Sequence, residues 1–232
     1  MSTEPLRAEY KWLAEEARYL TSNFGFTLPE ESWLDHDRLM DGCECLDRKV
    51  DGSPDEIRPS LTGRILQALR GGSPGDSMFD AELSTQIEYL VDIFERYGPA
   101  EYFLSRAEGI FGISEEIRAT SDRKHYVELV CREGRYFLEM FLPIFERHAT
   151  AEFMKFFPSV AEVGNLVDKL VDARADYRRG EMLLYPGVPH HLSLLKEITS
   201  RGWEAFRLFP NRTGLFVWAI RFFNPRRHIS AK

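Results

Sequence analysis

The chain has 232 residues, of which 44% are hydrophobic and 13% aromatic, enough for a substantial core in one large domain or two small ones. Its net charge of −7 and its pI near 5.5 argue against a nucleic-acid binder, which would normally carry a basic face. No apolar run approaches the ~20 residues of a transmembrane helix, and the polar start Met-Ser-Thr-Glu-Pro lacks the apolar segment of a signal peptide. Three cysteines, an odd number, indicate reduced thiols in a cytoplasmic protein.

Helical periodicity dominates the chain, and no long run alternates apolar and polar residues as a half-buried strand would. Gly71-Gly-Ser-Pro-Gly75 is the strongest loop signal, and Pro158 is expected to precede a helix rather than lie within one. No compositional boundary or internal repeat divides the sequence. We therefore predict one all-α domain over residues 1–232, a helical bundle. Its helices are expected near 5–22, 32–51, 55–70, 80–97, 100–118, 122–148, 159–179, 188–207 and 212–223.

Three aspartates recur at steps of four residues in the predicted helix near 159–179: Asp168, Asp172 and Asp176. A step of four turns a helix by about 400°, so the three carboxylates share one face about 6 Å apart. Carboxylates this close repel one another, so the row needs positive charge. Mg²⁺ is one source, because it favours a few carboxylates together with phosphate oxygens. Basic neighbours are the other source, and three are at hand: Arg174, Arg178 and Arg179.

A second acidic row lies nearer the N-terminus, where Glu44, Asp47 and Asp51 are spaced three and four residues apart and Asp41 extends the row. Acidic residues at helical spacing most often lie on a solvated face, especially with lysine and arginine interspersed, and this interpretation stays open for either row alone. The presence of two rows favours a functional one. Two acidic helices facing each other across a bundle could hold metal ions between them, with phosphate oxygens completing the coordination.

The run from Asn165 to Pro186 resembles the second aspartate-rich motif of class I isoprenoid synthases, as found in squalene and phytoene synthases and in bacterial tetraprenyl-curcumene-synthase-like terpene synthases. Asp168, Asp172 and Asp176 match the metal-binding acids of that motif, and Arg179, Gly180 and Pro186 match its sequel. The stretch from Glu44 to Asp51 looks like the first acidic motif. Two departures stand out: Gly42 or Cys43 replaces an expected acid, and the chain is short for this superfamily.

The resemblance implies an all-α Mg²⁺-dependent enzyme, a lyase or transferase that ionises a prenyl diphosphate and then cyclises or couples the allylic carbocation. It implies that Asp47 and Asp172 are catalytic. The metal ligands that it implies are Glu44, Asp47, Asp51, Asp168, Asp172 and Asp176. In such enzymes Mg²⁺ and basic side chains neutralise the charge that builds on the leaving diphosphate.

Diphosphate also needs cations from the protein, and arginine suits phosphate oxygens best. The candidates are Arg48, Arg123, Arg178 and Arg179. Taken alone, each of them is more often an ordinary surface charge than a phosphate ligand. A carbocation needs an apolar cavity whose aromatic faces stabilise it. The candidates for that cavity form a stripe at four-residue spacing, Phe137, Phe141 and Phe145, for which ordinary core packing is the competing interpretation.

The main alternative is a non-catalytic all-α interaction or regulatory protein whose acids pair with neighbouring arginines. A zinc site at Cys43-x-Cys45 with His36 lacks a second cysteine pair. A carboxylate-bridged di-metal bundle would need Glu-x-x-His pairs, which the chain does not contain. His190-His191 is expected at a helix start or on the surface. The sequence does not fix the oligomeric state, and a homodimer is kept open.

Overall fold

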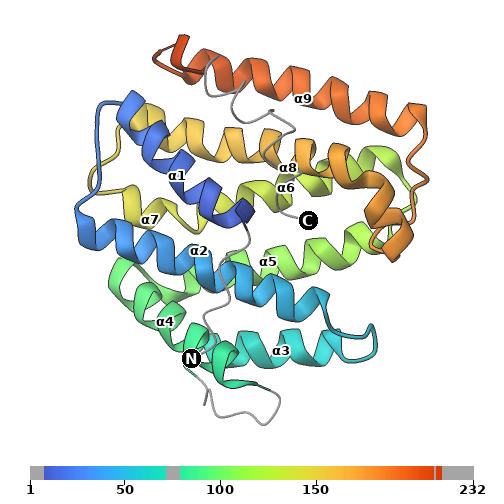
Figure 1. The fold of residues 1–232 in the computed structure, drawn as a ribbon, viewed down its shortest axis with the longest axis horizontal. Helices are drawn as coiled ribbons and strands as arrows, with labels where there is room; N and C mark the ends of the chain where they lie inside the picture. Colours follow the sequence, from blue (N-terminus) through green and yellow to red (C-terminus); the bar gives the residue numbers. More distant parts are fainter. Residues whose placement is uncertain (1–7, 72–78, 212, 216–232) are drawn as a thin grey trace. The chain divides into compact units, whose positions relative to one another are not determined.

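The computed structural model describes residues 8–71, 79–211 and 213–215. This part of the chain folds into α-helices joined by turns and loops and contains no β-strand, so the all-α prediction is confirmed. The helices are α1 (Ala8–Asn23), α2 (Glu30–Asp51), α3 (Arg58–Leu69), α4 (Ala81–Tyr97), α5 (Ala100–Ala119), α6 (Arg123–Glu139), α7 (Leu142–Phe145), α8 (Ala151–Arg179) and α9 (Val188–Leu208) (Figure 1).

The helices divide into two compact units. Unit 1 comprises the described residues of Met1–Leu104, Pro143–Ala149 and Thr213–Lys232, and within it α2 packs against α1, α3 and α4. Unit 2 comprises the described residues of Ser105–Leu142 and Thr150–Arg212, and within it α8 packs against both α6 and α9. The expectation of one domain over residues 1–232 stays a prediction.

Helix α4 shows how local sequence builds unit 1. Asp80 caps its N-terminus, because the Asp80 carboxylate accepts a hydrogen bond from the Leu83 backbone N–H at 2.9 Å. Leu83, Ile87 and Leu90 follow at helical spacing and are buried. This apolar stripe lies close to α2, since a Cβ added to Gly42 would be 2.7 Å from the Leu90 side chain. Helix α2, which carries the acidic row of Glu44, Asp47 and Asp51, is therefore packed closely against α4.

Helix α8 is the central element of unit 2 and is capped at both ends. Thr150 accepts a hydrogen bond from the Phe153 backbone N–H at 3.2 Å, and Gly180 ends the helix with a φ of 76°. This left-handed conformation costs glycine little. Between these caps α6 approaches closely at Gly134, where an added Cβ would lie 2.7 Å from the Ala161 carbonyl oxygen. The acidic row of α8 is thus carried by a helix that is fixed along its length.

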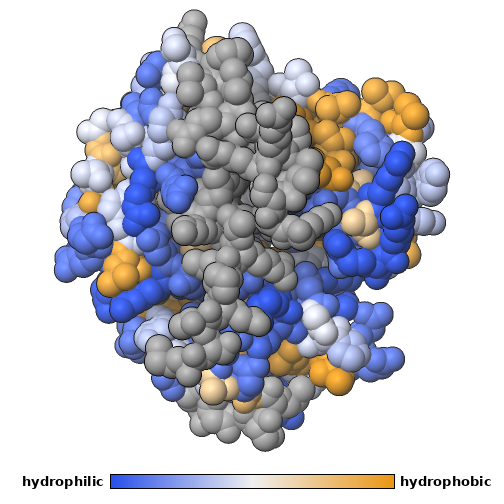
Figure 2. Space-filling view, in the orientation of Figure 1, coloured by the Kyte–Doolittle hydropathy of each residue, from blue (hydrophilic) through white to orange (hydrophobic). Residues whose placement is uncertain are grey.

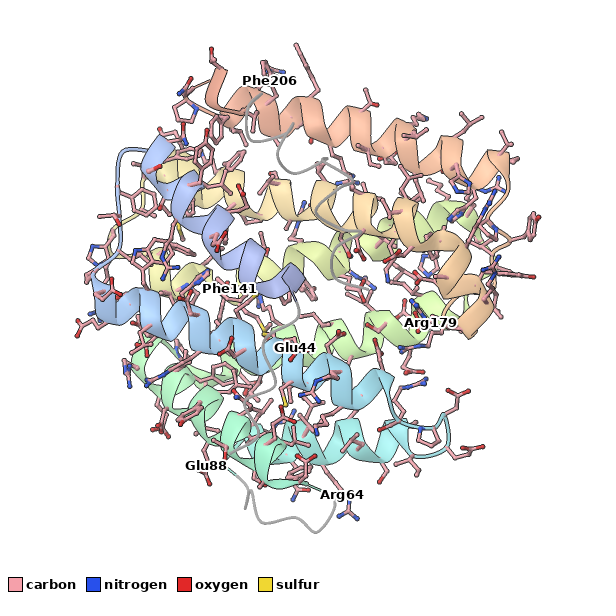
Figure 3. The ribbon with its side chains drawn as sticks, viewed as in Figure 1. Glu44, Arg64, Glu88, Phe141, Arg179 and Phe206 are labelled. Atoms are coloured by element: carbon pink, nitrogen blue, oxygen red, sulfur yellow. The ribbon has the colours of Figure 1, made fainter. Side chains whose placement is uncertain are left out.

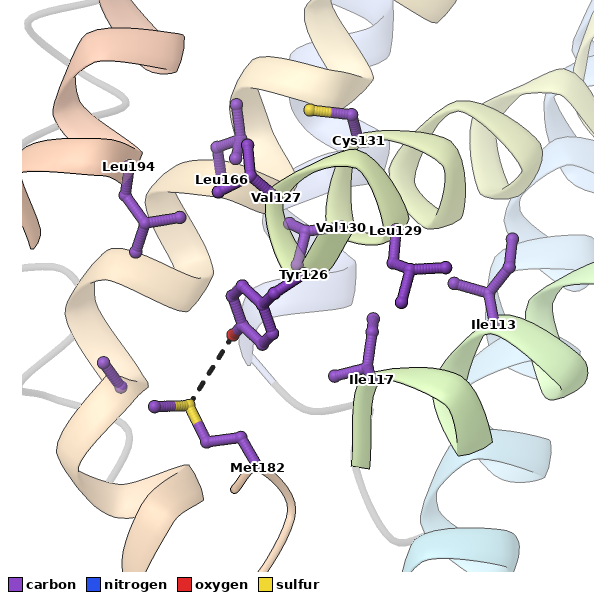
Figure 4. Packing of buried hydrophobic residues seen from close by; sticks show 11 residues of the cluster. Ile113, Ile117, Tyr126, Val127, Leu129, Val130, Cys131, Leu166, Met182 and Leu194 are labelled. Carbon is purple, nitrogen blue, oxygen red and sulfur yellow. Dashed lines mark hydrogen bonds between the residues drawn. The ribbon is translucent and has the colours of Figure 1, made fainter. Parts of the chain in front are cut away.

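The core of unit 2 is a cluster of buried side chains from α5, α6, α8, α9 and the segment after α8 (Figure 4). Tyr126 is fully buried, and its hydroxyl contacts the Met182 sulfur at 3.7 Å. This contact joins the segment that follows α8 to the first turn of α6 and so helps to position the last turns of α8. The cluster consists of Ile113, Ile117, Tyr126, Val127, Leu129, Val130, Cys131, Leu166, Ala173, Met182 and Leu194.

Two predicted helix boundaries are wrong. The helix expected near 159–179 begins at Ala151, so Pro158 lies inside it. Proline removes a helical hydrogen bond, but the helix continues because Phe156, Phe157 and Val160 are buried on both sides of the proline. The helix expected near 122–148 ends at Glu139 and is followed by the short α7. The helix predicted near 212–223 falls almost wholly outside the described residues.

The search for membrane-spanning segments covered the described residues, and none of their helices combines the length and apolar character that crossing a bilayer requires.

The contact between α6 and α8 predicts opposite effects for two glycine substitutions in unit 2. We expect Gly134→Ala to lower the free energy of unfolding by about 1–3 kcal/mol, because the added methyl group meets backbone and Asn165 at 2.7 Å. Gly112→Ala in α5 is the matched control, since its Cβ meets nothing within 4 Å. It should stabilise by about 0.5–1 kcal/mol through helix propensity. Urea unfolding followed by circular dichroism measures both, and equal effects would contradict the close approach.

Candidate functional site

The aspartate row on α8 runs from solvent into the core of unit 2. Asp168 is exposed, Asp172 is half-buried, and Asp176 is only 3% exposed. Each step of four residues turns a helix by about 40° beyond a full circle, so the row winds across the helix surface instead of staying in line. The three carboxylates therefore lie in different environments, although their spacing is regular.

Asp176, the buried end of the row, is neutralised by cations of the chain itself. Its Oδ1 accepts a hydrogen bond from the Arg179 guanidinium at 2.6 Å, and the Lys169 ammonium lies 3.6 Å from its Oδ2. Burial raises the pKa of Asp176, while Lys169 and Arg179 act in the opposite direction. Arg179 also donates to Glu181 at 2.7 Å, at the C-terminal end of α8 (Figure 3). These contacts show that basic neighbours provide part of the compensating charge that the row requires.

Lys169 connects the row to α6 through a network of charges. Burial by itself lowers the pKa of Lys169, but nearby Glu133, Asp176 and Asp168 together raise that pKa above its ordinary value. Glu133 is held in place because its carboxylate accepts hydrogen bonds from the Ser114 hydroxyl at 2.6 Å and from the Asn165 amide at 3.0 Å. Lys169 therefore stays charged inside unit 2 and is matched by acids from two helices.

Whether Mg²⁺ fits depends on the two carboxylates nearer the surface, Asp168 and Asp172. Mg²⁺ is commonly held by one or two carboxylates together with phosphate oxygens. Asp172 has no hydrogen-bond or ion-pair partner among the described residues, and Asp168 faces solvent. Asp176 does not fit, because its oxygens already bind Lys169 and Arg179. In the described part of the chain no group of three or more His, Cys, Asp or Glu side chains could hold a metal. A metal ion at this row would therefore need further ligands, such as phosphate oxygens.

The acidic row of α2 lies in unit 1 and shows a similar gradient. Glu44 is buried, Asp47 is half-buried, and Asp51 is exposed (Figure 3). Arg48 lies 3.5 Å from the Glu44 carboxylate and also binds Glu82 of α4 at 2.5 Å. Cations of the chain therefore contact this row as well, and Arg48 is shared between two acids.

Asp41, which extends the α2 row, has a raised pKa. Burial raises its pKa to about 6, and the neighbouring carboxylates of Asp37 and Glu44 add to the effect. Its Oδ1 is buried without a hydrogen-bond partner among the described residues. An ionised carboxylate in this position is costly, because it is partly buried and lies near two other carboxylates. Asp41 is therefore a pH-sensitive position in unit 1.

The four arginines predicted to bind diphosphate lie in different settings. Arg48 and Arg179 are engaged in the ion pairs described above. Arg178 is exposed at the end of α8. Arg123, at the start of α6, lines a groove of about 400 Å³ in unit 2. The residues that line this groove are Arg123, Lys124, Val127, Glu128, Ser193, Lys196, Glu197 and Arg201.

The aromatic residues predicted to line a cavity do not share one helix. Phe137 belongs to α6 and is half-buried, and its ring centroid lies 5.5 Å from that of Phe141, which is fully buried in the turn after α6. Phe145 belongs to α7 in unit 1, where it is fully buried against Trp33 and His36. The cavity role of these rings stays a prediction.

In the comparison with known proteins, no family model, no curated protein and no solved structure matches the chain. The case for a function therefore depends on the residues and their geometry.

The raised pKa of Asp41 predicts a pH-dependent gain in stability for Asp41→Asn. In the folded chain Asp41 loses its proton near pH 6, and in the unfolded chain near the ordinary value of 3.8. The folded state therefore holds more protons between these values, so its stability falls as the pH rises through this window. Removing the charge should add about 1–3 kcal/mol near pH 7 and little near pH 4.

Urea unfolding at the two pH values measures this difference. Asp92→Asn is the control, because Asp92 is exposed on α4 of the same unit and its charge should matter little. A loss of stability at neutral pH, or an equal gain at both pH values, would contradict the assignment of Asp41.

Proposed function

We propose that this protein is a Mg²⁺-dependent enzyme similar to class I terpene and prenyl synthases. It ionises a prenyl diphosphate and then cyclises or couples the allylic carbocation that remains. The observation that supports this most is the geometry of α8. One continuous helix carries Asp168 and Asp172 with carboxylates that reach solvent, and it fixes Asp176 with cations of the chain. Such a helix can present two carboxylates to a phosphate-bound metal ion.

In this proposal Asp168 and Asp172 hold Mg²⁺ together with the diphosphate oxygens of the substrate. The ion supplies neutralisation of the charge that develops on the leaving diphosphate. Asp176 has a positioning role, because it keeps Lys169 and Arg179 beside the other two carboxylates. Arg178, which is exposed at the same end of α8, provides a guanidinium for the phosphate oxygens.

The proposal gives the α2 row, Glu44, Asp47 and Asp51, the role of a second set of ligands, with Asp47 as the residue whose loss is most harmful. Glu44 is held by Arg48, as Asp176 is held by Arg179, so both rows combine one restrained acid with two that reach the surface. We also propose a cytoplasmic location, which the three free cysteines and the resemblance support.

A second candidate is a non-catalytic all-α interaction or regulatory protein. The observation that favours it is the extent of ion pairing around the acids: Arg179 and Lys169 contact Asp176, and Arg48 contacts Glu44. These pairs compensate the buried acids from within the chain and need no ligand. On this candidate the acidic rows serve solubility or partner contacts.

The test of catalysis is release of diphosphate from geranyl, farnesyl and geranylgeranyl diphosphate in the presence of Mg²⁺. We expect turnover with at least one of them, and we expect Asp172→Asn to abolish it, because the metal loses one of its two protein carboxylates. The loss should be on the order of a hundredfold or more. Asp47→Asn tests the α2 row separately, and Asp92→Asn on α4 is the matched control that should keep activity.

Thermal unfolding separates the two candidates. Mg²⁺ with diphosphate should raise the melting temperature of the wild-type chain by ligand linkage, and less so that of Asp172→Asn. The enzyme proposal would be contradicted if the folded chain turned over no member of the series and its melting temperature did not change with Mg²⁺ and diphosphate. The second candidate would then remain.

A further inference from the structure

Helix α9 has apolar side chains on two opposite faces. Its inner face packs against α8 through Leu194 and Ala205, which are buried. Its outer face carries Val188, Leu192 and Leu195, exposed by 72%, 60% and 45%. Since these three side chains are exposed, the packing of α9 against α8 and α6 within unit 2 does not explain them.

The outer stripe continues to both ends of the helix. Trp203 is 62% exposed and its ring stacks on Phe206, with the centroids 5.5 Å apart. Before α9, Leu183 and Tyr185 are exposed by 58% and 73%. Figure 2 shows apolar atoms gathered at the upper right, where Figure 1 places the start of α9. We call Leu183, Tyr185, Val188, Leu192, Leu195 and Trp203 the outer stripe.

Cations lie along one edge of the outer stripe. Lys196 follows Leu192 by four residues, and Arg207 follows Trp203 by four, so each is the surface neighbour of an exposed apolar side chain. Both are exposed, and neither has an ion-pair partner among the described residues. Lys196 also lines the groove of about 400 Å³ in unit 2, together with Arg123, Lys124 and Arg201. The groove is also lined by Glu128, 3.8 Å from Lys124, and by Glu197, 3.5 Å from Arg201, so its four cations exceed its two acids. This local excess of positive charge lies beside the stripe, although the chain as a whole carries −7.

We propose that α9 binds the surface of an anionic lipid bilayer, with the outer stripe among the acyl chains and Lys196, Arg207 and the groove at the phosphates. Helices that lie in a membrane interface combine leucine and tryptophan on one face with lysine and arginine beside it. Tryptophan and tyrosine favour the interface, because their rings are apolar with a polar tip. Charge complementarity favours anionic lipid over a second copy of this acidic chain. The proposal is independent of the proposed reaction.

The test is co-sedimentation of the full chain with vesicles of phosphatidylglycerol and phosphatidylcholine, compared with vesicles of phosphatidylcholine alone. We expect binding to the anionic vesicles, weakened by salt. Leu192→Ser should reduce the partition coefficient about tenfold, because one leucine fewer is then buried among the acyl chains. Lys196→Gln and Arg207→Gln should each reduce it about fivefold. All three side chains are exposed, so folding is not at risk.

Two matched controls should bind as the wild type does. Leu34→Ser removes a leucine that is 51% exposed on α2, and Lys155→Gln removes an exposed lysine on α8. Trp203 gives a second readout, because vesicles should shift its fluorescence to shorter wavelength and Trp203→Phe should abolish that shift.

Three outcomes would overturn the proposal. The first is no binding to the anionic vesicles. The second is binding that Leu192→Ser leaves unchanged. The third is a concentration-dependent dimer, seen by sedimentation without vesicles and dissociated by Leu192→Ser, which would assign the outer stripe to a second copy. Inorganic phosphate that binds the groove and leaves vesicle binding intact would limit the membrane contact to the stripe and overturn the role of the groove.

Discussion

The site depends on the attraction between the charged Lys169 side chain and the acids around it in unit 2. Its ammonium lies among Glu133, Asp168 and Asp176, so it holds together acids of α6 and α8 that would otherwise repel one another. Burial of such a cation is tolerated only because opposite charges surround it. The close approach of the two helices at Gly134 makes this arrangement possible. Asp176 is thereby fixed, while Asp168 and Asp172 remain open to the surface.

The pattern of the aspartate row could be predicted from the sequence, because helical spacing alone places Asp168, Asp172 and Asp176 on neighbouring turns. Their different burial follows from the helical drift, but only packing shows which end enters the core. The role of Lys169 could not be predicted, because its partner Glu133 lies on another helix. The prediction that Pro158 precedes a helix is wrong for a related reason: the burial of Phe156 and Phe157 outweighs the local cost of proline.

In helix α9, too, the burial of side chains could not be predicted from the sequence. The sequence predicts His190-His191 at a helix start or on the surface. The pair lies in the first turn of α9, but His190 is fully buried against Tyr126, and burial lowers its pKa to about 4. The exposure of the outer stripe could not be predicted from periodicity either. Which of Leu192 and Leu194 is buried depends on the helices that pack against α9. If both proposals hold, α8 binds the phosphate end of a substrate while α9 contacts a lipid surface, two tasks for adjacent helices of one unit.

The most direct test of the proposed site is a crystal structure of the chain with Mg²⁺ and an unreactive thiolo analogue of a prenyl diphosphate. The account predicts a metal ion about 2.1 Å from carboxylate oxygens of both Asp168 and Asp172, coordinated also by diphosphate oxygens, with Asp176 still bound to Arg179 and Lys169. An analogue bound elsewhere, or bound without any metal contact to Asp168 and Asp172, would contradict it.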